Sequence, residues 1–172
     1  MSSGKFTDVS AYIETLLQAK QKVLIFSSYT SHLKIYTDWC DKNGTLYSLL
    51  TGSTKIKDRE TEVANFQKDE NTLLFFISLK AGGVGLNLTK ASYVLILDPW
   101  WNPAVEQQAI DRTHRIGQDK KVFIYKFISK DTVEEKILAL QQRKLDLANE
   151  LVTSDESILR ALSEDEVLDL LS

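Results

Sequence analysis

A glutamine and two arginines stand at helical spacing in the segment QQAIDRTHRIGQ, residues 107–118. At 100° per residue, the side chains of Gln108, Arg112 and Arg115 fall within an arc of roughly 60°. Two guanidiniums on one side of a helix suit a multiply charged anion such as a phosphate. The same arginines could instead be solvated charges near a helix C-terminus, paired with Asp111 or Asp119. The segment alone leaves both interpretations open.

The apolar residues of this segment predict which face of its helix is buried. Val105, Ala109 and Ile116 fall within about 40° of one another, and this apolar arc lies beside the arginines. We therefore expect the arginines at the margin of the buried face, where a cleft would lie. Glu106, Ile110 and His114 should point elsewhere.

A glycine-rich segment, SLKAGGVGLNL at residues 78–88, follows an apolar run. Its backbone amides could bind phosphate at the end of a strand. The segment lacks the Gly-Lys-Ser/Thr of a Walker A loop and the spacing of a dinucleotide fingerprint. A tight structural turn is an equal alternative, although Ser78, Lys80 and Asn87 favour a loop that faces a ligand.

The remaining candidates for chemistry are few. The segment DPWWNP places two tryptophans together after a strand, and we expect Trp101 to be the exposed one because it adjoins the start of a helix. His32 and His114 have no partners at metal-ligand spacing, so surface or capping roles are expected for both. The single cysteine, Cys40, excludes a disulfide framework and is expected in the core.

Strand-like and helix-like segments alternate up to about residue 150, and they must position these candidates. Apolar runs predict strands at residues 22–29, 45–52, 71–78, 91–98 and 121–129, with a sixth strand left open. Such alternation predicts an α/β fold, a parallel sheet with helices on both faces. The candidate segments follow strand ends, where ligands bind in sheets of this kind.

Helices are expected between these strands. One covers residues 32–44 and is closed by Gly44, and the next carries Ile56, Val63 and Phe66 after a cap at Ser53 or Thr54. The helix that carries the two arginines is expected to have Asn102 as its cap and Pro103 in its first turn.

The last 40 residues follow a different pattern. Asp131 and Glu134 form a candidate capping box that opens a long helix. Its apolar stripe, which Lys144 interrupts, should pack back onto the protein and consists of Val133, Ile137, Leu140, Leu147 and Leu151. Residues 163–171 predict a short acidic amphipathic helix.

Charge and composition limit the classes of function. The chain has 172 residues, a net charge of −3 and 43% hydrophobic residues, as expected for an ordinary globular protein. Residues 1–120 carry a net charge of +1 and residues 121–172 carry −4. Any nucleic-acid contact must therefore be a local groove. No segment is apolar enough for a signal peptide or a membrane span, so an intracellular protein without membrane partners is expected.

Taken together, four segments resemble the second RecA-like lobe of a SWI/SNF-type helicase-like ATPase of superfamily 2. They are VLIFSSYT, LTGSTKIKDR, SLKAGGVGLNLTKASYVLILDPWWNP and QQAIDRTHRIGQ, in the order and spacing of that family. The resemblance runs from about Lys5 to Leu151. It implies a RecA-like α/β fold with a C-terminal bracing helix. The pair DPWWNP and DRxHRIGQ is the most specific part.

The resemblance implies an active site shared between two lobes. The first lobe of the family supplies the phosphate loop and the Asp-Glu metal site, which this sequence lacks, so ATP and Mg²⁺ are expected to bind mainly there. Arg112 and Arg115 match the arginines that reach across to the γ-phosphate, where charge develops during phosphoryl transfer. Gln108 and Gly85 match nucleotide-binding positions of the family.

The resemblance also implies sequence-independent contacts with double-stranded DNA. Trp101 matches a family tryptophan that contacts the duplex. The positions that match phosphate-binding residues are Ser53, Thr54, Ser78, Lys80, Gly82 and Gly83. Hydroxyls, amides and one lysine need little net positive charge, which agrees with the value of −3.

The chain is thus expected to be half of a DNA translocase motor, with the first RecA-like lobe of the same parent chain as its partner. The expected division is a lobe at residues 1–130, a bracing helix at 131–152 and an acidic tail at 153–172. The fragment should be monomeric and inactive alone. Its location should be nuclear in a eukaryote and cytoplasmic or nucleoid-associated in a bacterium. The alternatives are a catalytically silent interaction module with this fold and a free-standing nucleotide-binding α/β enzyme.

Overall fold

The structure, a computed structural model, describes residues 4–81, 86, 88–111 and 121–152. Helices and strands alternate along these residues, apart from two successive strands, β3 and β4. Their bounds, in chain order, are α1 Gly4–Gln18, β1 Val23–Ser27, α2 Thr30–Lys42, β2 Tyr47–Leu50, α3 Ile56–Lys68, β3 Leu74–Ser78, β4 Tyr93–Ile96, α4 Pro103–Asp111, β5 Phe123–Lys126 and α5 Val133–Val152.

The five strands form one parallel sheet in the order β2-β3-β1-β4-β5. The apolar runs of the sequence predicted all five, and the α/β fold is confirmed. β1 and β3 are completely buried, as expected for the central strands of a covered parallel sheet. β5 lies at the edge, and all four of its residues are exposed.

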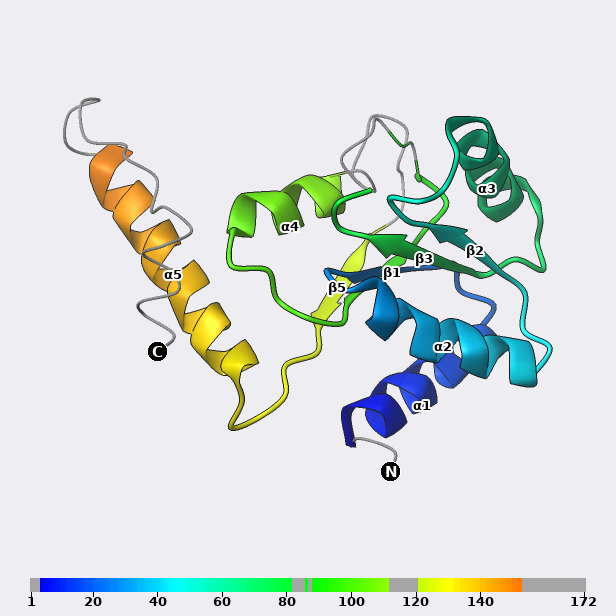
Figure 1. Cartoon of the computed structure of the whole chain (residues 1–172), viewed down its shortest axis with the longest axis horizontal. Coiled ribbons are helices and arrows are strands. Elements are labelled where there is room, and N and C mark those ends of the chain that lie inside the picture. The colour runs from blue at the N-terminus through cyan, green and yellow to red at the C-terminus, as the bar shows by residue number, and fades with distance from the viewer. Residues whose placement is uncertain (1–3, 82–85, 87, 112–120, 153–172) are drawn as a thin grey trace.

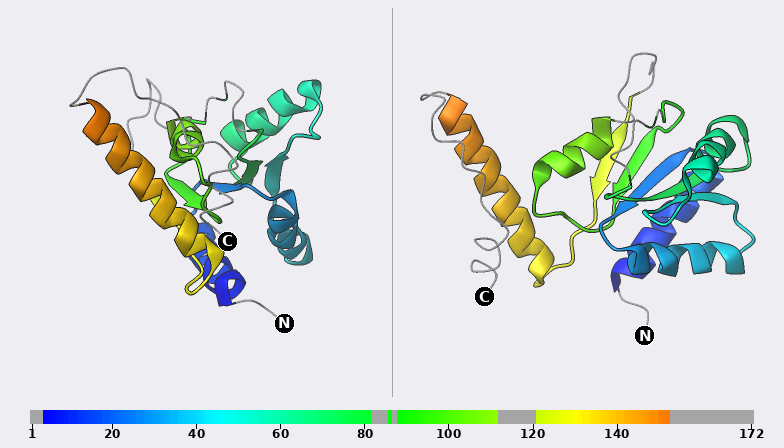
Figure 2. Two further views of the ribbon diagram at one scale, coloured as in Figure 1. Left: turned by 60° about the vertical axis from the view of Figure 1, so that its left-hand side comes forward. Right: turned by 45° about the horizontal axis from the view of Figure 1, so that its top comes forward.

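Helices cover both faces of the sheet, as Figures 1 and 2 show. On one face α1 and α2 bury Val9, Ile13, Leu33 and Tyr36 against the alternate strand residues that point to that side. On the other face, α3 and α4 bury Phe66 and Ile110 against a second cluster. The carboxyl ends of the strands are thereby fixed between two helical layers.

Helix α1 was not among the elements expected from the sequence. Its buried residues Val9, Ile13 and Leu16 stand at helical spacing, and this periodicity could have identified it. Helix α2 ends as predicted: Gly44 has a φ of 64°, and the amide of Thr45 donates to the carbonyl of Cys40 over 2.9 Å. Cys40 is buried, also as predicted, and burial raises the pKa of its thiol to about 12.

Two of the expected helix caps are wrong. Helix α3 is preceded by Lys55, which makes no side-chain cap, and not by Ser53 or Thr54. At α5 the capping pattern is displaced by one residue, because Thr132 Oγ1 accepts from the amide of Glu134 while Glu135 reaches back to the amide of Asp131. The cap at Asn102 is confirmed by its contact with the amide of Ala104 at 3.2 Å.

The C-terminal helix α5 lies beside α4, at the left of Figure 1. Its expected apolar stripe is only partly correct, since Ile137 and Leu140 are half-buried but Val133 and Leu147 are 53% and 51% exposed. Lys144 belongs to the contact face, because its ammonium lies 5.0 Å from the ring centre of Trp101. The expected acidic helix at residues 163–171 lies outside the described residues. None of the described helices combines the length and apolarity that a membrane span requires.

Candidate functional site

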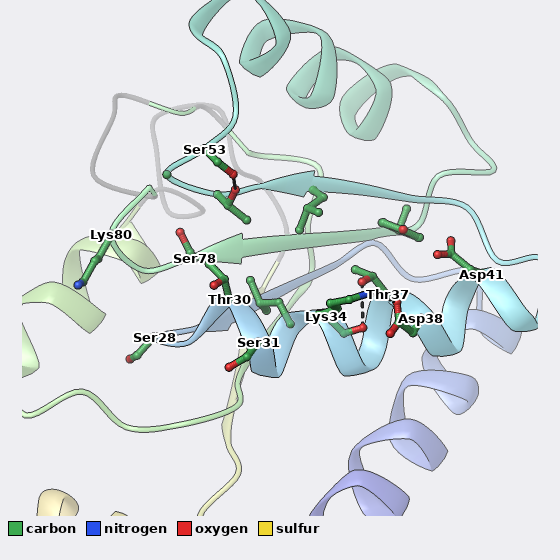
Figure 3. Close-up of a pocket in the computed structure, with 15 residues that line it drawn as sticks. Ser28, Thr30, Ser31, Lys34, Thr37, Asp38, Asp41, Ser53, Ser78 and Lys80 are labelled. Atoms are coloured by element: carbon green, nitrogen blue, oxygen red, sulfur yellow. Dashed lines mark hydrogen bonds and ion pairs between the residues drawn. The ribbon is translucent and has the colours of Figure 1, made fainter.

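The main candidate site is a pocket of about 700 Å³ at the carboxyl ends of β1, β2 and β3, bounded by α2. Ser53, Ser78 and Lys80 line this first pocket together (Figure 3). They come from two different strand ends and meet because parallel strands end at one edge of the sheet. The structure therefore brings together three of the four phosphate-binding candidates that it describes.

Ser78 and Lys80 have different roles in this pocket. Ser78 ends β3 and is buried, and its hydroxyl accepts the amide of Ala81 at 3.3 Å. The amide of Leu79 donates to the carbonyl of Ser27, which ties the turn to β1. Ser78 thus shapes the turn, whereas Lys80 is exposed and, within the part of the chain that the structure describes, has no side-chain partner.

The turn after β2 carries the other two hydroxyl candidates. Thr54 Oγ1 accepts the amide of Thr51 at 2.9 Å and closes the turn. Ser53 is exposed, and its hydroxyl lies 2.8 Å from Thr51 Oγ1 at the pocket rim. Of this pair, Ser53 is the residue that presents its side chain to the pocket.

Charge is unevenly distributed along the first pocket (Figure 3). Lys80 stands at one end with the serines, while Asp38 and Asp41 line the other end along α2. The nearby Lys34 pairs with Asp38 at 2.7 Å, so its charge is already compensated. A phosphate would therefore favour the end with Lys80.

A second pocket, of about 290 Å³, adjoins the first. Ser28 and Lys80 line both pockets, and the second is completed by Leu79, Trp100, Val105 and Gln108. Gln108 is the one predicted nucleotide-binding residue that the structure describes, and it lies on the side of α4 that faces Lys80 across this pocket. A lysine ammonium and a glutamine amide in one pocket can both donate hydrogen bonds to phosphate oxygens.

Asp98 is a buried residue of this region that the sequence analysis missed. Its carboxylate accepts hydrogen bonds from the hydroxyl of Ser27, from the amide of Ser28 at 2.7 Å and from His32 Nδ1 at 3.1 Å. Burial alone would raise the pKa of Asp98, but the hydrogen bonds from His32, Ser27 and the Ser28 amide outweigh burial and hold this pKa below its ordinary value. His32 is therefore a tertiary contact of Asp98, not the surface or capping residue expected.

The two tryptophans of the DPWWNP segment are both half-buried. Trp100 packs against the core cluster and lines the second pocket. Trp101 contacts α5 through Lys144, so it is less exposed than the sequence analysis expected. A partner of Trp101 thus comes from a helix some 40 residues later in the chain.

The buried face of α4 differs from the expected one. Glu106 is 1% exposed and Ile110 is 7% exposed, whereas both were expected to point elsewhere. The carboxylate of Glu106 accepts the amide of Trp100 at 2.6 Å and pairs with Lys126 at 2.6 Å. The periodicity of apolar residues misses this face because its central residue is a carboxylate whose partners are distant in the sequence. Val105, on the expected face, is half-buried.

Several predicted site residues lie outside the described residues: Gly82, Gly83, Gly85, Arg112 and Arg115. Helix α4 is described up to Asp111, the residue directly before Arg112. In the described part of the chain, no group of three His, Cys, Asp or Glu side chains could hold a metal ion.

The chain is similar to a helicase family and to proteins named as helicases or DNA repair proteins. The model of the helicase conserved C-terminal domain matches residues 4–117. An uncharacterised ATP-dependent helicase of Schizosaccharomyces pombe is 48% identical over 130 residues, 76% of this chain, and DNA repair protein RAD5A of Arabidopsis thaliana is 41% identical over 156 residues, 91% of this chain. The chain spans only 12% and 15% of those relatives.

A solved structure extends the similarity to the fold. The crystal structure of the C-terminal part of the Fun30 ATPase domain aligns with 99% of this chain and 53% of its own chain, at a TM-score of 0.82 and 37% identity. The match includes the region of α5, beyond the end of the family model at residue 117.

Proposed function

Because the chain belongs to the helicase conserved C-terminal domain family, as the second RecA-like lobe of the SWI/SNF type, we propose that it is one half of an ATP-dependent motor on double-stranded DNA. The observation that carries this proposal is the arrangement of two adjoining pockets that share Lys80. One pocket would face the DNA backbone and the other would face the nucleotide.

The nucleotide side rests on helix α4. Gln108 faces the second pocket, and Arg112 and Arg115 follow in the same segment at a spacing that suits a phosphate. In this proposal the two arginines stabilise the charge that develops on the γ-phosphate, and Gln108 and Gly85 bind the nucleotide. Such arginines contribute about 10³–10⁵ in rate in phosphoryl-transfer enzymes.

The DNA side rests on the first pocket. Ser53 and Lys80 are exposed and present polar groups to this pocket. Contacts of hydroxyls, amides and lysine with phosphates carry no sequence information. Trp101 would contact the duplex from the neighbouring loop. Two relatives are named as DNA repair proteins, of Arabidopsis thaliana and Cryptococcus neoformans, which supports DNA as the substrate.

The complete motor requires a first RecA-like lobe of the same parent chain. We assign to that lobe the phosphate loop and the ligands of Mg²⁺, and to this chain the groups that act across the cleft. Within the chain, residues 1–130 form the lobe, 131–152 a bracing helix and 153–172 an acidic tail. Closure of the two lobes on ATP and reopening after hydrolysis would alternate the grip on one DNA backbone.

Turnover of ATP by a full-length protein with both lobes tests the proposal. Arg115→Ala should lower DNA-stimulated ATP hydrolysis at least about a hundredfold, because it removes charge stabilisation from the transition state. Arg143→Ala, an exposed arginine of α5, is the matched control and should leave turnover unchanged. Unchanged turnover in Arg115→Ala, with the fold intact, would favour the alternative of a catalytically silent interaction module.

A further inference from the structure

Helix α5 is attached to the rest of the molecule mainly through polar residues. Among its side chains that the structure describes, Gln141 alone is buried, at 3% exposure. Leu138, Leu145 and Leu147 are 39–51% exposed. Apolar burial therefore contributes little to the position of α5, and polar contacts hold it. Glu134 at its start pairs with Lys5 of α1 at 2.6 Å, Lys144 lies over Trp101, and Gln141 makes the buried contacts with α4.

Gln141 connects α5 to two segments at once. Its side-chain amide donates to Glu106 Oε1 at 2.7 Å and to the carbonyl of Trp100. Glu106 in turn accepts the amide of Trp100 at 2.6 Å and pairs with Lys126 of β5 at 2.6 Å. One buried cluster, Gln141 with Glu106, Trp100 and Lys126, thus joins α5, α4, the tryptophan loop and the sheet edge.

A buried carboxylate makes this cluster sensitive to geometry. A buried carboxylate that loses a hydrogen-bond donor is still removed from water, and nothing then offsets the free energy of its desolvation. A carboxylate with only some of its hydrogen bonds made is therefore strongly unfavourable. The amide of Gln141 satisfies Glu106 and the Trp100 carbonyl only when α5 lies in one register against α4. Such a network therefore specifies one relative position of the two helices.

The cluster lies directly behind one wall of the second pocket. That wall consists of Trp100, Val105 and Gln108. The carboxylate of Glu106 accepts the backbone amide of Trp100, and Glu106 directly follows Val105 in the sequence. The opposite wall, Leu79 and Lys80, follows β3 and is fixed by the sheet. The distance between the walls thus depends on how α4 and the Trp100 segment are held.

We propose that Gln141 and Glu106 are positioning residues, through which α5 sets the Trp100–Gln108 wall of the second pocket against Lys80. The inference rests on the proposed function in assigning that pocket to nucleotide. It adds that α5 determines whether the pocket is correctly formed. Movement of α5 would then change the nucleotide side of the lobe without touching the nucleotide.

Hydrogen exchange of the 172-residue chain tests the coupling independently of catalysis. Gln141→Leu keeps the size of the side chain and removes both donors. Exchange of the amides at residues 100–111 should accelerate at least about tenfold, because a buried carboxylate loses a hydrogen bond and local opening becomes easier. The amides of β1 and β3 should keep their protection.

The control is Gln142→Leu, in the next position of the same helix. Gln142 is exposed, and among the described residues its side chain bonds only within α5, to Asp146 at 2.8 Å, so this variant should leave exchange at residues 100–111 unchanged. Gln141→Asn, which shortens the side chain by one methylene, gives a milder second variant in which exchange of the same amides should accelerate to a smaller extent. Unaltered exchange at residues 100–111 in both Gln141 variants would overturn the proposal.

Catalysis distinguishes this inference from the proposed function. In a full-length protein with both lobes, Gln141→Leu should lower kcat for ATP about tenfold, the size expected for one buried hydrogen bond to a charged group, and leave DNA affinity unchanged. Rescue by Gln141→Asn should be partial. A fully active Gln141→Leu protein overturns the positioning role and leaves the motor function standing. A wild-type protein without DNA-stimulated turnover overturns the motor function, and the exchange result would remain.

Discussion

The carboxylate of Asp98 joins the end of β4 to Ser27 and Ser28 at the end of β1 and to His32 at the start of α2. These contacts fix the loop that leads into the two tryptophans. Hydrogen bonds hold the pKa of Asp98 below its ordinary value, so the folded chain stabilises the ionised carboxylate relative to the unfolded chain. This residue therefore links stability to pH.

Asp98→Asn should lower the free energy of unfolding at neutral pH by about 1–3 kcal/mol, since charged hydrogen bonds of a buried group are lost. The contribution of Asp98 is complete above the ordinary pKa of an aspartate and disappears as pH falls through the lower, folded-state pKa. Urea unfolding at pH 7 and at pH 3 measures the free energy of unfolding of both proteins. The difference between variant and wild type should be smaller at pH 3. Asp38→Asn, at an exposed carboxylate, is the control; an equal gap at both pH values would contradict the argument.

Lys80 offers a second prediction at the scale of one residue. Lys80→Ala should weaken DNA binding uniformly across sequences and reduce the slope of log affinity against log salt by about 1, the effect of one lost phosphate contact. Lys34→Ala removes the same charge from the same pocket, but Lys34 is already paired with Asp38. Titration of a labelled duplex at several salt concentrations gives the slope for each of the two variants. Equal slopes would show that Lys80 does not contact DNA phosphates.

At the scale of elements, apolar patterns predicted the strands well because a buried parallel strand needs an almost continuous apolar run. The same reasoning failed for α4 and α5, where Glu106 and Gln141 are among the buried residues. A carboxylate and an amide can be buried only because they satisfy each other and Trp100, and no local pattern reveals partners 35 and 41 residues apart. Likewise, the sequence identified Ser53 as a site residue only through a family resemblance, whereas Lys80 was also indicated by its place in the glycine-rich segment.

The end of α2 gives a prediction for a single element. Gly44 has a φ of 64°, and a Cβ added there would meet nothing within 4 Å. Gly44→Ala should therefore destabilise the fold by about 1–2 kcal/mol through backbone conformation alone. Gly52→Ala, which also meets nothing within 4 Å and has no such φ, should be nearly neutral. Thermal unfolding compares them, and equal melting temperatures would show that the backbone at Gly44 adapts to a side chain at little cost.

At the scale of the whole molecule, the pockets and the net charge of −3 point to a lobe that binds its ligands only in part. In the first pocket, as far as the structure describes it, Lys80 is the one lysine without an ion-pair partner, and a single lysine cannot hold a duplex tightly. Its contribution should be strongly salt-dependent. The second pocket presents three polar side chains that can bind a phosphate, Ser28, Lys80 and Gln108. Affinity and turnover should then both require a second lobe.

The 172-residue chain should consequently bind a DNA duplex weakly, lose that binding between about 50 and 200 mM salt, and hydrolyse no ATP. Addition of the first lobe in the same chain should restore DNA-stimulated turnover, because the phosphate loop and the metal site would then face the arginines. Phosphate release by the isolated chain and by the two-lobed protein, each with and without DNA, measures both statements. Tight nucleotide binding or steady turnover by the isolated chain would contradict a shared site and would support a free-standing nucleotide-binding enzyme.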